Sequence, residues 1–160
     1  MGAGGLVGSA LARAGGPLGW VALDRNACDV TSAREREEAL RRYKPDAVVF
    51  AAAFTDVDAA ATNPASGAVN EAAPAAWAQQ VETWFFSSNF VFDGPGPHGP
   101  AAIPRPGSVY ASQKVAAEGA VLGAGGHVVR VGWVFGPGGR TFASTLAAKL
   151  AAGETVRAVH

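Results

Sequence analysis

Short apolar runs alternate with longer amphipathic segments along this 160-residue chain. The runs are rich in valine, phenylalanine and tryptophan and are bounded by glycine, proline or acidic residues, which is typical of buried β-strands. They predict strands at 19–24, 46–54, 82–88 and 127–136, and a fifth strand that begins at 154. Because these runs do not alternate strictly between apolar and polar side chains, they predict a parallel sheet covered on both faces.

The segments between the runs have helical spacing. They predict a helix after the N-terminal glycines and further helices at 31–45, in the later part of 63–80, at 108–122 and at 141–153. Thr31 or Ser32 is the expected N-cap of the second helix, Pro74 must lie in a first turn or a break, and Gly153 is expected just after the last helix. Strands that alternate with helices predict a doubly wound, Rossmann-like α/β domain spanning 1–160.

Composition narrows the class of protein. Lysine and arginine number 13, as do aspartate and glutamate, so the formal net charge is zero and gives no basis for binding nucleic acid or an anionic membrane. The longest apolar run, 47–54, is too short to cross a bilayer. The single cysteine, Cys28, cannot form an internal disulfide, which suits a reducing compartment. We therefore predict a cytoplasmic protein and no metal site.

Three glycines near the start of the chain, Gly2, Gly5 and Gly8, have the spacing of a dinucleotide-binding turn. In such a turn they allow a tight bend, close approach of the backbone to a pyrophosphate, and close packing of the next helix. Asp24 ends the next predicted strand, where an acid would hydrogen-bond the adenine ribose. Arg25 beside it could accept a 2′-phosphate, so NADH and NADPH both stay open as cofactors. In a chain with 21 glycines, this spacing can also arise without function.

A dinucleotide-binding turn normally follows a buried strand, and only Met1 precedes this one. In the doubly wound fold the first strand is central, so its loss would leave buried backbone groups of its neighbours unpaired. We therefore expect Met1 to stand where the last residue of that strand belongs, as in a truncated or mis-assigned start.

Tyr110 and Lys114 lie four residues apart and so share one face of a predicted helix. A phenol that exchanges protons near neutral pH needs a lowered pKa, and a lysine one turn away favours the phenolate. Ser87 and Ser88 end an apolar strand at the sheet edge where ligands of open α/β sheets bind. There the Ser88 hydroxyl can hydrogen-bond a substrate carbonyl while the tyrosine transfers the proton. The alternative is an ordinary helix surface and the start of a loop.

Several segments, taken in order, carry a family resemblance: GAGGLVG at 2–8, KPDAVVFAAAFTDVDAAATNP at 44–64, SSNFVFDG at 87–94, VYASQKVAAE at 109–118 and VRVGWVFGP at 129–137. They resemble the dTDP-4-dehydrorhamnose reductases of the extended short-chain dehydrogenase/reductase superfamily. The resemblance implies NAD(P)H-dependent reduction of the C4 keto group of a dTDP-4-keto-6-deoxysugar, in dTDP-rhamnose biosynthesis. It implies a nucleotide-sugar substrate and a homodimer as partners.

The resemblance also assigns roles to residues. It implies contacts with the cofactor pyrophosphate for Gly2, Gly5, Leu6, Val7 and Gly8. It implies contacts with the adenine for Asp29 and Val30, and with the ribose and nicotinamide for Ala51, Ala52 and Ala53. Tyr110 would donate the proton to the sugar oxygen, and Lys114 would lower its pKa and hold the nicotinamide ribose. The substrate side would comprise Ser88, Asn89 and Trp133, although without the resemblance Trp133 is expected in the core.

The chain departs from the family pattern at four places. Asn89 stands where an aspartate is usual, Ala111 replaces a glycine, and the stretch from Asn70 to Ser87 is about five residues short. The C-terminal lobe that supplies most of the sugar pocket would follow His160. These departures keep two alternatives open: another nucleotide-sugar epimerase or dehydratase, and a catalytically silent NAD(P)-binding regulatory module.

Overall fold

The computed structural model describes residues 1–137 and 141–156. At its centre lies a parallel sheet in which β1 (Ala47–Phe50), β2 (Glu82–Ser88) and β3 (His127–Val131) are neighbours in that order. Val48 pairs with Thr83, and Ser88 pairs with Val131. Because the strands run in the same direction, their carboxyl ends meet at one edge of the sheet. Ser88 and the segment 51–54 therefore emerge at that edge.

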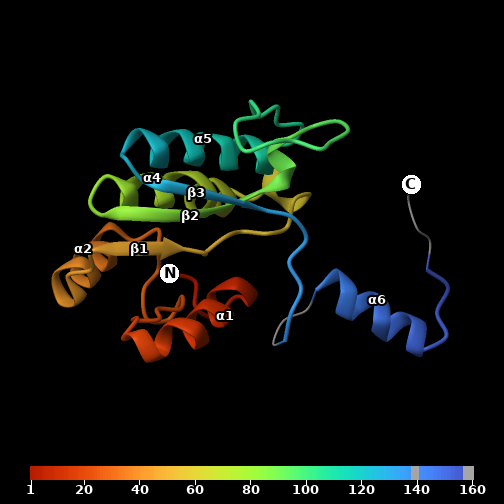
Figure 1. Cartoon of the computed structure of the whole chain (residues 1–160), viewed down its shortest axis with the longest axis horizontal. Coiled ribbons are helices and arrows are strands. Elements are labelled where there is room, and N and C mark those ends of the chain that lie inside the picture. Colours follow the sequence, from red (N-terminus) through yellow and green to blue (C-terminus); the bar gives the residue numbers. More distant parts are fainter. Residues whose placement is uncertain (138–140, 157–160) are drawn as a thin grey trace.

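The helices lie on both sides of this sheet (Figure 1). Those N-terminal to β2 are α1 (Leu6–Gly15), η1 (Gly16–Leu18), α2 (Ala33–Tyr43), η2 (Ala59–Ala61), α3 (Ala65–Gly67), the π-helix η3 (Ala68–Ala72) and α4 (Ala73–Ala78). Those that follow are η4 (Asn89–Val91), α5 (Val109–Gly123) and α6 (Phe142–Ala151). In Figure 1, α4 and α5 cover one side of the sheet, α1 lies on the other, and α6 stands away from it. This arrangement confirms the predicted parallel, Rossmann-like α/β fold.

The core is built around three large aromatic side chains. Phe50 of β1, Phe85 of β2 and Trp77 of α4 are fully buried, and the two phenylalanine rings lie 6.2 Å apart. The Trp77 indole N–H donates a hydrogen bond to the Val30 carbonyl oxygen at 3.2 Å. Burial of a large apolar side chain contributes roughly 1.5–3 kcal/mol. The indole bond also joins α4 to the segment that leads into α2.

Local helix signals in the sequence are confirmed. Ser32 is the N-cap of α2, and its hydroxyl accepts a hydrogen bond from the Glu35 N–H. Pro74 lies in the first turn of α4, which directly continues the π-helix η3. Gly153 follows the C-cap of α6 with φ of 73°, a left-handed conformation that glycine adopts without strain.

The prediction of a buried strand at 19–24 is wrong. This segment is not part of the sheet, and Trp20 and Val21 are 49% and 55% exposed, whereas Leu23 is buried. A backbone hydrogen bond from the Ala3 N–H to the Leu23 carbonyl oxygen, 3.0 Å long, joins it to the chain beside it. A ladder needs a series of such bonds, so the segment is extended without being a strand.

Two other predicted strands are shorter than the sequence indicates. β1 ends at Phe50 instead of 54, and β3 ends at Val131 instead of 136, because the chain leaves the sheet at its carboxyl edge. At the predicted fifth strand, 154–156 form no strand and 157–160 lie outside the described residues. Within the described ranges, no helix combines the length and apolar character needed to cross a membrane.

Met1 lies beside β1 in a parallel-ladder arrangement. Its amino group donates to the Val49 carbonyl oxygen at 2.6 Å, and its own carbonyl oxygen accepts from the Ala51 N–H at 3.1 Å. These two bonds place Met1 opposite Phe50, directly before the glycine turn. The backbone of β1 therefore has a hydrogen-bonded neighbour at its carboxyl end, and the turn starts at the sheet edge.

Candidate functional site

The N-terminal glycine turn packs directly against the segment that follows β1. Gly2 has φ of 80°, and a Cβ placed on it would lie 2.6 Å from the Ala52 backbone nitrogen. A Cβ on Gly8, in the first turn of α1, would overlap the Gly2 carbonyl oxygen. Gly2 is required by its positive φ and by this contact, and Gly8 is required by contact alone. Close approach of backbone to backbone here is the arrangement that a dinucleotide-binding turn needs.

The start of α1 offers backbone donors next to this turn. Gly5 is the N-cap, and no side chain caps the helix, so the N–H groups of Leu6, Val7 and Gly8 keep their donor capacity. The N-terminus of a helix attracts anions because the helix dipole and these N–H groups act together. The residues predicted to contact the pyrophosphate therefore lie in the turn and in the first turn of α1, where Gly5 is exposed and Gly8 is buried.

Asp24 lies against the same turn. Its Cβ is 3.7 Å from the position that a Cβ on Gly4 would occupy. One carboxylate oxygen, Oδ1, accepts hydrogen bonds from the N–H groups of Asn26 and Ala27 at 3.0 and 2.9 Å. These bonds fix an exposed carboxylate beside the glycine turn, which is the position the sequence predicts for a ribose-binding acid.

The two residues expected near the adenine are held by other parts of the chain. The Asp29 carboxylate accepts from the Thr31 hydroxyl at 2.7 Å and from its N–H at 3.0 Å, and these bonds lower the pKa of Asp29. Val30 is buried, and its carbonyl oxygen accepts the Trp77 indole bond. The Val30 side chain is therefore part of the core, and a contact between Val30 and the adenine stays a prediction.

Tyr110, Lys114 and Ser88 form the second half of the site. Ser108 is the N-cap of α5, so the helix begins just before Tyr110. Lys114 lies one turn later on the same face of the helix. All three side chains are buried, with Tyr110 and Ser88 each 7% exposed and Lys114 1% exposed. The Lys114 ammonium donates to the Phe86 carbonyl oxygen at 2.8 Å and lies 4.2 Å from the centre of the Phe85 ring.

The pKa of Tyr110 shifts in the direction opposite to the one expected from the sequence. Burial raises the pKa of Tyr110 above its usual value, and the nearby Ser88 hydroxyl opposes this shift. Lys114 does not lower it, since its ammonium is turned toward the Phe86 carbonyl oxygen. A buried phenol with a raised pKa remains protonated at neutral pH, and so it is a proton donor rather than a base.

Lys114 should make stability depend on pH. Burial lowers the pKa of Lys114 from 10.5 to about 8, and the Glu118 carboxylate opposes this shift. Between these two values the unfolded chain binds more protons than the folded one, so the free energy of unfolding rises with pH by up to about 1.4 kcal/mol per pH unit. Urea unfolding of Lys114→Met, compared with the unchanged chain from pH 8 to 10, should lack this rise. If the free energies of unfolding of the two proteins changed with pH in parallel, this role of Lys114 would be contradicted.

The predicted substrate residues are placed less favourably. Asn89 is exposed at the sheet edge, directly after Ser88. Trp133 is 62% exposed and packs on Phe142 with ring centres 4.4 Å apart, so the expectation of a core position is wrong. The chain after β3 runs away from α5 toward α6 (Figure 1). The structure brings Ser88 and Tyr110 together, whereas Trp133 packs on Phe142 of α6.

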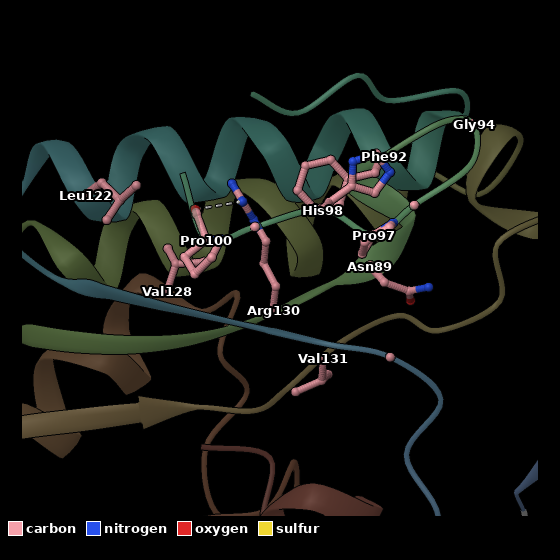
Figure 2. A pocket seen from close by; sticks show the side chains of 13 residues that line it. Asn89, Phe92, Gly94, Pro97, His98, Pro100, Leu122, Val128, Arg130 and Val131 are labelled. Atoms are coloured by element: carbon pink, nitrogen blue, oxygen red, sulfur yellow. Dashed lines mark hydrogen bonds between the residues drawn. The ribbon is translucent and has the colours of Figure 1, made fainter. Parts of the chain in front are cut away.

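A cavity of about 740 Å³ lies next to this site, between the loop after β2 and the outer side of β3. Figure 2 shows His98 and Pro100 of the loop and Arg130 of β3 at its walls. Asn89 lines the cavity as well, which connects it to the end of β2. Glycine and proline form much of the loop wall, so the cavity offers few side chains that could position a ligand.

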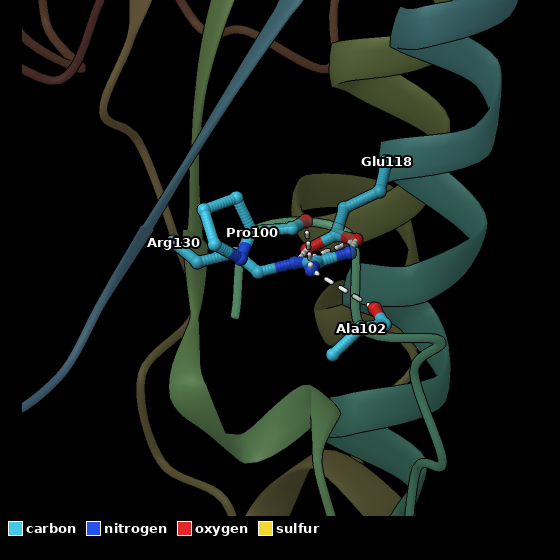
Figure 3. Close-up of polar contacts among 4 residues, drawn as sticks. All are labelled: Pro100, Ala102, Glu118 and Arg130. Atoms are coloured by element: carbon cyan, nitrogen blue, oxygen red, sulfur yellow. Dashed lines mark hydrogen bonds and ion pairs between the residues drawn. The ribbon is translucent and has the colours of Figure 1, made fainter. Parts of the chain in front are cut away.

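An ion pair that the sequence analysis missed fixes this loop. Arg130 binds both carboxylate oxygens of Glu118, with Nη2 to Oε2 at 2.6 Å, and its Nη1 lies 3.5 and 3.4 Å from the carbonyl oxygens of Pro100 and Ala102 (Figure 3). The side chain of Glu118 is 3% exposed. Glu118 follows Lys114 by four residues, so helical spacing already places it on the face of Tyr110 and Lys114. Its buried charge has no signal in the sequence.

Arg130→Met should destabilise the fold. It leaves the Glu118 carboxylate buried without its guanidinium, and removing one partner of a buried pair costs about 3–5 kcal/mol. We expect the lower end of this range, because the Arg130 side chain is 21% exposed. Urea unfolding measures the loss. The double variant Arg130→Met with Glu118→Leu should recover most of it, and a double variant as unstable as the single one would refute this explanation.

The chain is similar to known proteins along its whole length. Over residues 1–160 it matches the family described as the RmlD substrate binding domain. The dTDP-4-dehydrorhamnose reductase of Mycobacterium tuberculosis (strain CDC 1551 / Oshkosh) is 37% identical, in a match that covers 95% of this chain and 55% of that protein. The Escherichia coli protein of the same name is 33% identical over 89% of this chain and 53% of its own length. The chain thus spans about half the length of these curated relatives.

Solved structures agree with the fold. The dTDP-4-dehydrorhamnose reductase from Yersinia enterocolitica is 27% identical with a TM-score of 0.82, covering 94% of this chain and 58% of that one. The Bacillus anthracis str. Ames protein of the same name, solved in complex with NADP, is 24% identical with a TM-score of 0.84 over the same shares. At 24% identity, the similarity to the Bacillus anthracis protein shows a shared fold alone. With a family match over its whole length and a glycine turn at the sheet edge, the chain belongs to the RmlD substrate binding domain family.

Proposed function

We propose that this chain is the cofactor-binding part of an NAD(P)H-dependent reductase acting on the C4 keto group of a dTDP-4-keto-6-deoxysugar. The observation that carries the proposal is the meeting of two groups of residues at one edge of the sheet. The glycine turn packs on Ala51 and Ala52 there, and β2 ends there at Ser88, beside Tyr110. Relatives named dTDP-4-dehydrorhamnose reductase support the choice of substrate.

The described residues fit a dinucleotide. The turn from Gly2 to Gly8 has no room for a Cβ at its first and last glycines, and free helix N–H groups adjoin it. Asp24 would hold the adenine ribose, and the small side chains from Ala51 to Ala53 would allow the ribose and nicotinamide to approach. When bound, the reduced nicotinamide supplies a hydride to the carbonyl carbon.

Residues of this protein would supply the proton and would position the carbonyl oxygen of the substrate. Tyr110 would donate its phenolic proton to the carbonyl oxygen as negative charge develops there, and its raised pKa keeps that proton available. The Ser88 hydroxyl would donate a hydrogen bond to the same oxygen. Lys114 uses one N–H on the Phe86 carbonyl oxygen, which leaves two for the cofactor ribose or the phenol.

The partners follow from the same proposal. A nucleotide-sugar would approach the sheet edge from the side of Ser88 and Asn89, where the neutral Asn89 amide could hydrogen-bond a sugar hydroxyl. A relative of known structure, MoeE5, was solved with UDP-glucose and NAD. A homodimer, expected from the family, and a cytoplasmic location, expected from the composition, complete the proposal.

The proposal is tested by two measurements on the purified chain. Quenching or enhancement of NADPH fluorescence measures cofactor binding, and NADPH oxidation on adding dTDP-4-keto-6-deoxymannose measures reduction. Binding together with reduction supports the full proposal. Binding without reduction at high enzyme concentration would refute the catalytic part for this chain and favour a regulatory NAD(P)-binding module. Absence of binding would refute both.

A further inference from the structure

A network of buried amide and hydroxyl groups connects the segment after Ala53, on the cofactor side of the proposed site, to the helix that carries Tyr110 and Lys114. We propose that this network, formed by Asn70, Gln113 and Ser66, sets the distance between that segment and α5, and that Gln113 is a positioning residue for cofactor binding. The inference rests on the proposed function for its ligand. Its structural basis is independent of the ligand.

The first link holds the segment after Ala53. The Asn70 side chain pairs with the Phe54 backbone as a strand would: Oδ1 accepts from the Phe54 N–H at 2.9 Å, and Nδ2 donates to the Phe54 carbonyl oxygen at 3.0 Å. Asn70 is fully buried and lies in the π-helix η3. Such helical irregularities are frequent at functional sites. The end of the Ala51–Ala53 run is therefore fixed by one side chain.

The second link reaches α5. The other Nδ2 hydrogen of Asn70 points to Gln113 Oε1 at 3.3 Å, and Gln113 Nε2 donates to the Ser66 hydroxyl at 2.9 Å. The Ser66 hydroxyl in turn donates to the Ala60 carbonyl oxygen at 2.9 Å. Ser66 is 1% exposed and Gln113 is 9% exposed, so water does not compete for these bonds.

The pattern of donors and acceptors admits one orientation of Gln113. Asn70 presents a donor to it, and Ser66 presents an acceptor because its own hydrogen is used on Ala60. A flipped amide would place two donors face to face, and a shorter side chain would leave a buried group unpaired. Gln113 directly precedes Lys114. A shift in this contact would therefore move Lys114 and Tyr110 relative to Ala51–Ala53.

The experiment compares NADPH affinity among variants of the full chain. Gln113→Met keeps the length of the side chain and removes both of its hydrogen bonds. Ser66→Ala removes the acceptor of Gln113 together with the hydrogen bond from Ser66 to the Ala60 carbonyl oxygen. The control is Gln80→Met, since Gln80 is exposed. We expect Gln113→Met to lose about tenfold or more in affinity at a temperature where it is fully folded, as misplacement of binding groups by a fraction of an ångström does. Gln80→Met should stay within about twofold.

Two further results decide the interpretation. If the residues act as one unit, Ser66→Ala combined with Gln113→Met binds no more weakly than Gln113→Met alone. The inference would be overturned if the two substitutions reduced NADPH affinity by independent factors that multiply in the double variant. It would also be overturned if the affinity of Gln113→Met stayed within about twofold of that of the unchanged chain. If Gln113→Met does not fold, Ser66→Ala decides alone, with a loss of affinity supporting the inference and an unchanged affinity overturning it.

A readout without cofactor separates this inference from the proposed function. The chain has two tyrosines, so in a Tyr43→Phe background the absorbance of tyrosinate reports Tyr110 alone. Gln113→Met should move the Tyr110 titration toward the ordinary value, because loosening α5 admits water to the phenol. If the unchanged chain does not bind NADPH, the proposed function fails, and this titration decides whether the hydrogen bonds of Gln113 hold Tyr110 in place. A shift supports that structural part of the inference, and an identical curve overturns it.

Discussion

Replacing Tyr110 with phenylalanine should reduce NADPH-dependent reduction of the keto sugar by at least about a hundredfold, because proton transfer by a positioned acid contributes 10²–10⁴-fold. The change removes one oxygen and leaves the ring, which packs edge-on against Phe90 at 6.2 Å. NADPH affinity should therefore stay within about threefold, since the aromatic packing that orders the start of α5 is retained. Rates of NADPH oxidation and fluorescence binding curves measure the two quantities.

The matched control is Tyr43→Phe, which removes the other phenol of the chain. Tyr43 is 37% exposed at the end of α2, so its loss should leave the reduction rate unchanged. A Tyr110→Phe protein that retained more than a tenth of the rate would show that another group donates the proton. The Ser88 hydroxyl would then be the next candidate at that position.

Gly8→Ala should abolish cofactor binding, lowering NADPH affinity by at least about a hundredfold. The added methyl group overlaps the Gly2 carbonyl oxygen, which belongs to the backbone and has no flexible side chain that could move aside. Either α1 shifts away from the turn or the turn opens, and displacement of about an ångström in a binding site costs affinity on this scale. Fluorescence titration measures the loss, and urea unfolding shows whether the fold has also been weakened.

Gly16→Ala is the matched control, because a Cβ on Gly16 meets no atom within 4 Å. Gly16 also has helical backbone angles that alanine adopts readily, so this substitution should be neutral or slightly stabilising. If Gly8→Ala bound NADPH as well as Gly16→Ala, the glycine turn would not be the pyrophosphate site.

Local patterns predicted most of the fold. Strand β2 and helix α5 agree with the sequence to within one residue, because apolar periodicity and a serine cap act within the segment itself. The segment 19–24 has an equally good strand pattern and yet joins no ladder. A strand needs a neighbour with matching hydrogen bonds, and the pattern of one segment does not report what lies beside it.

The positions of the candidate residues in the fold were more predictable than their electrostatics. Spacing alone placed Tyr110 above Lys114 on one helical face, and the structure has this geometry. The sign of the Tyr110 pKa shift depends on how deeply the phenol is buried and on where the Lys114 ammonium points. The link from Asn70 through Gln113 joins residues 43 positions apart, so it has no signal in a single sequence.

The buried indole of Trp77 gives the molecule a built-in optical reporter. Of the four tryptophans, Trp77 is fully buried, whereas Trp20, Trp84 and Trp133 are between 40% and 62% exposed. Its emission should be blue-shifted and shielded from aqueous quenchers such as iodide, while the other three are quenched. Because its N–H is bonded to the Val30 carbonyl oxygen, the shielded component would follow separation of α4 from the segment before α2, and so would reveal local opening that precedes complete unfolding.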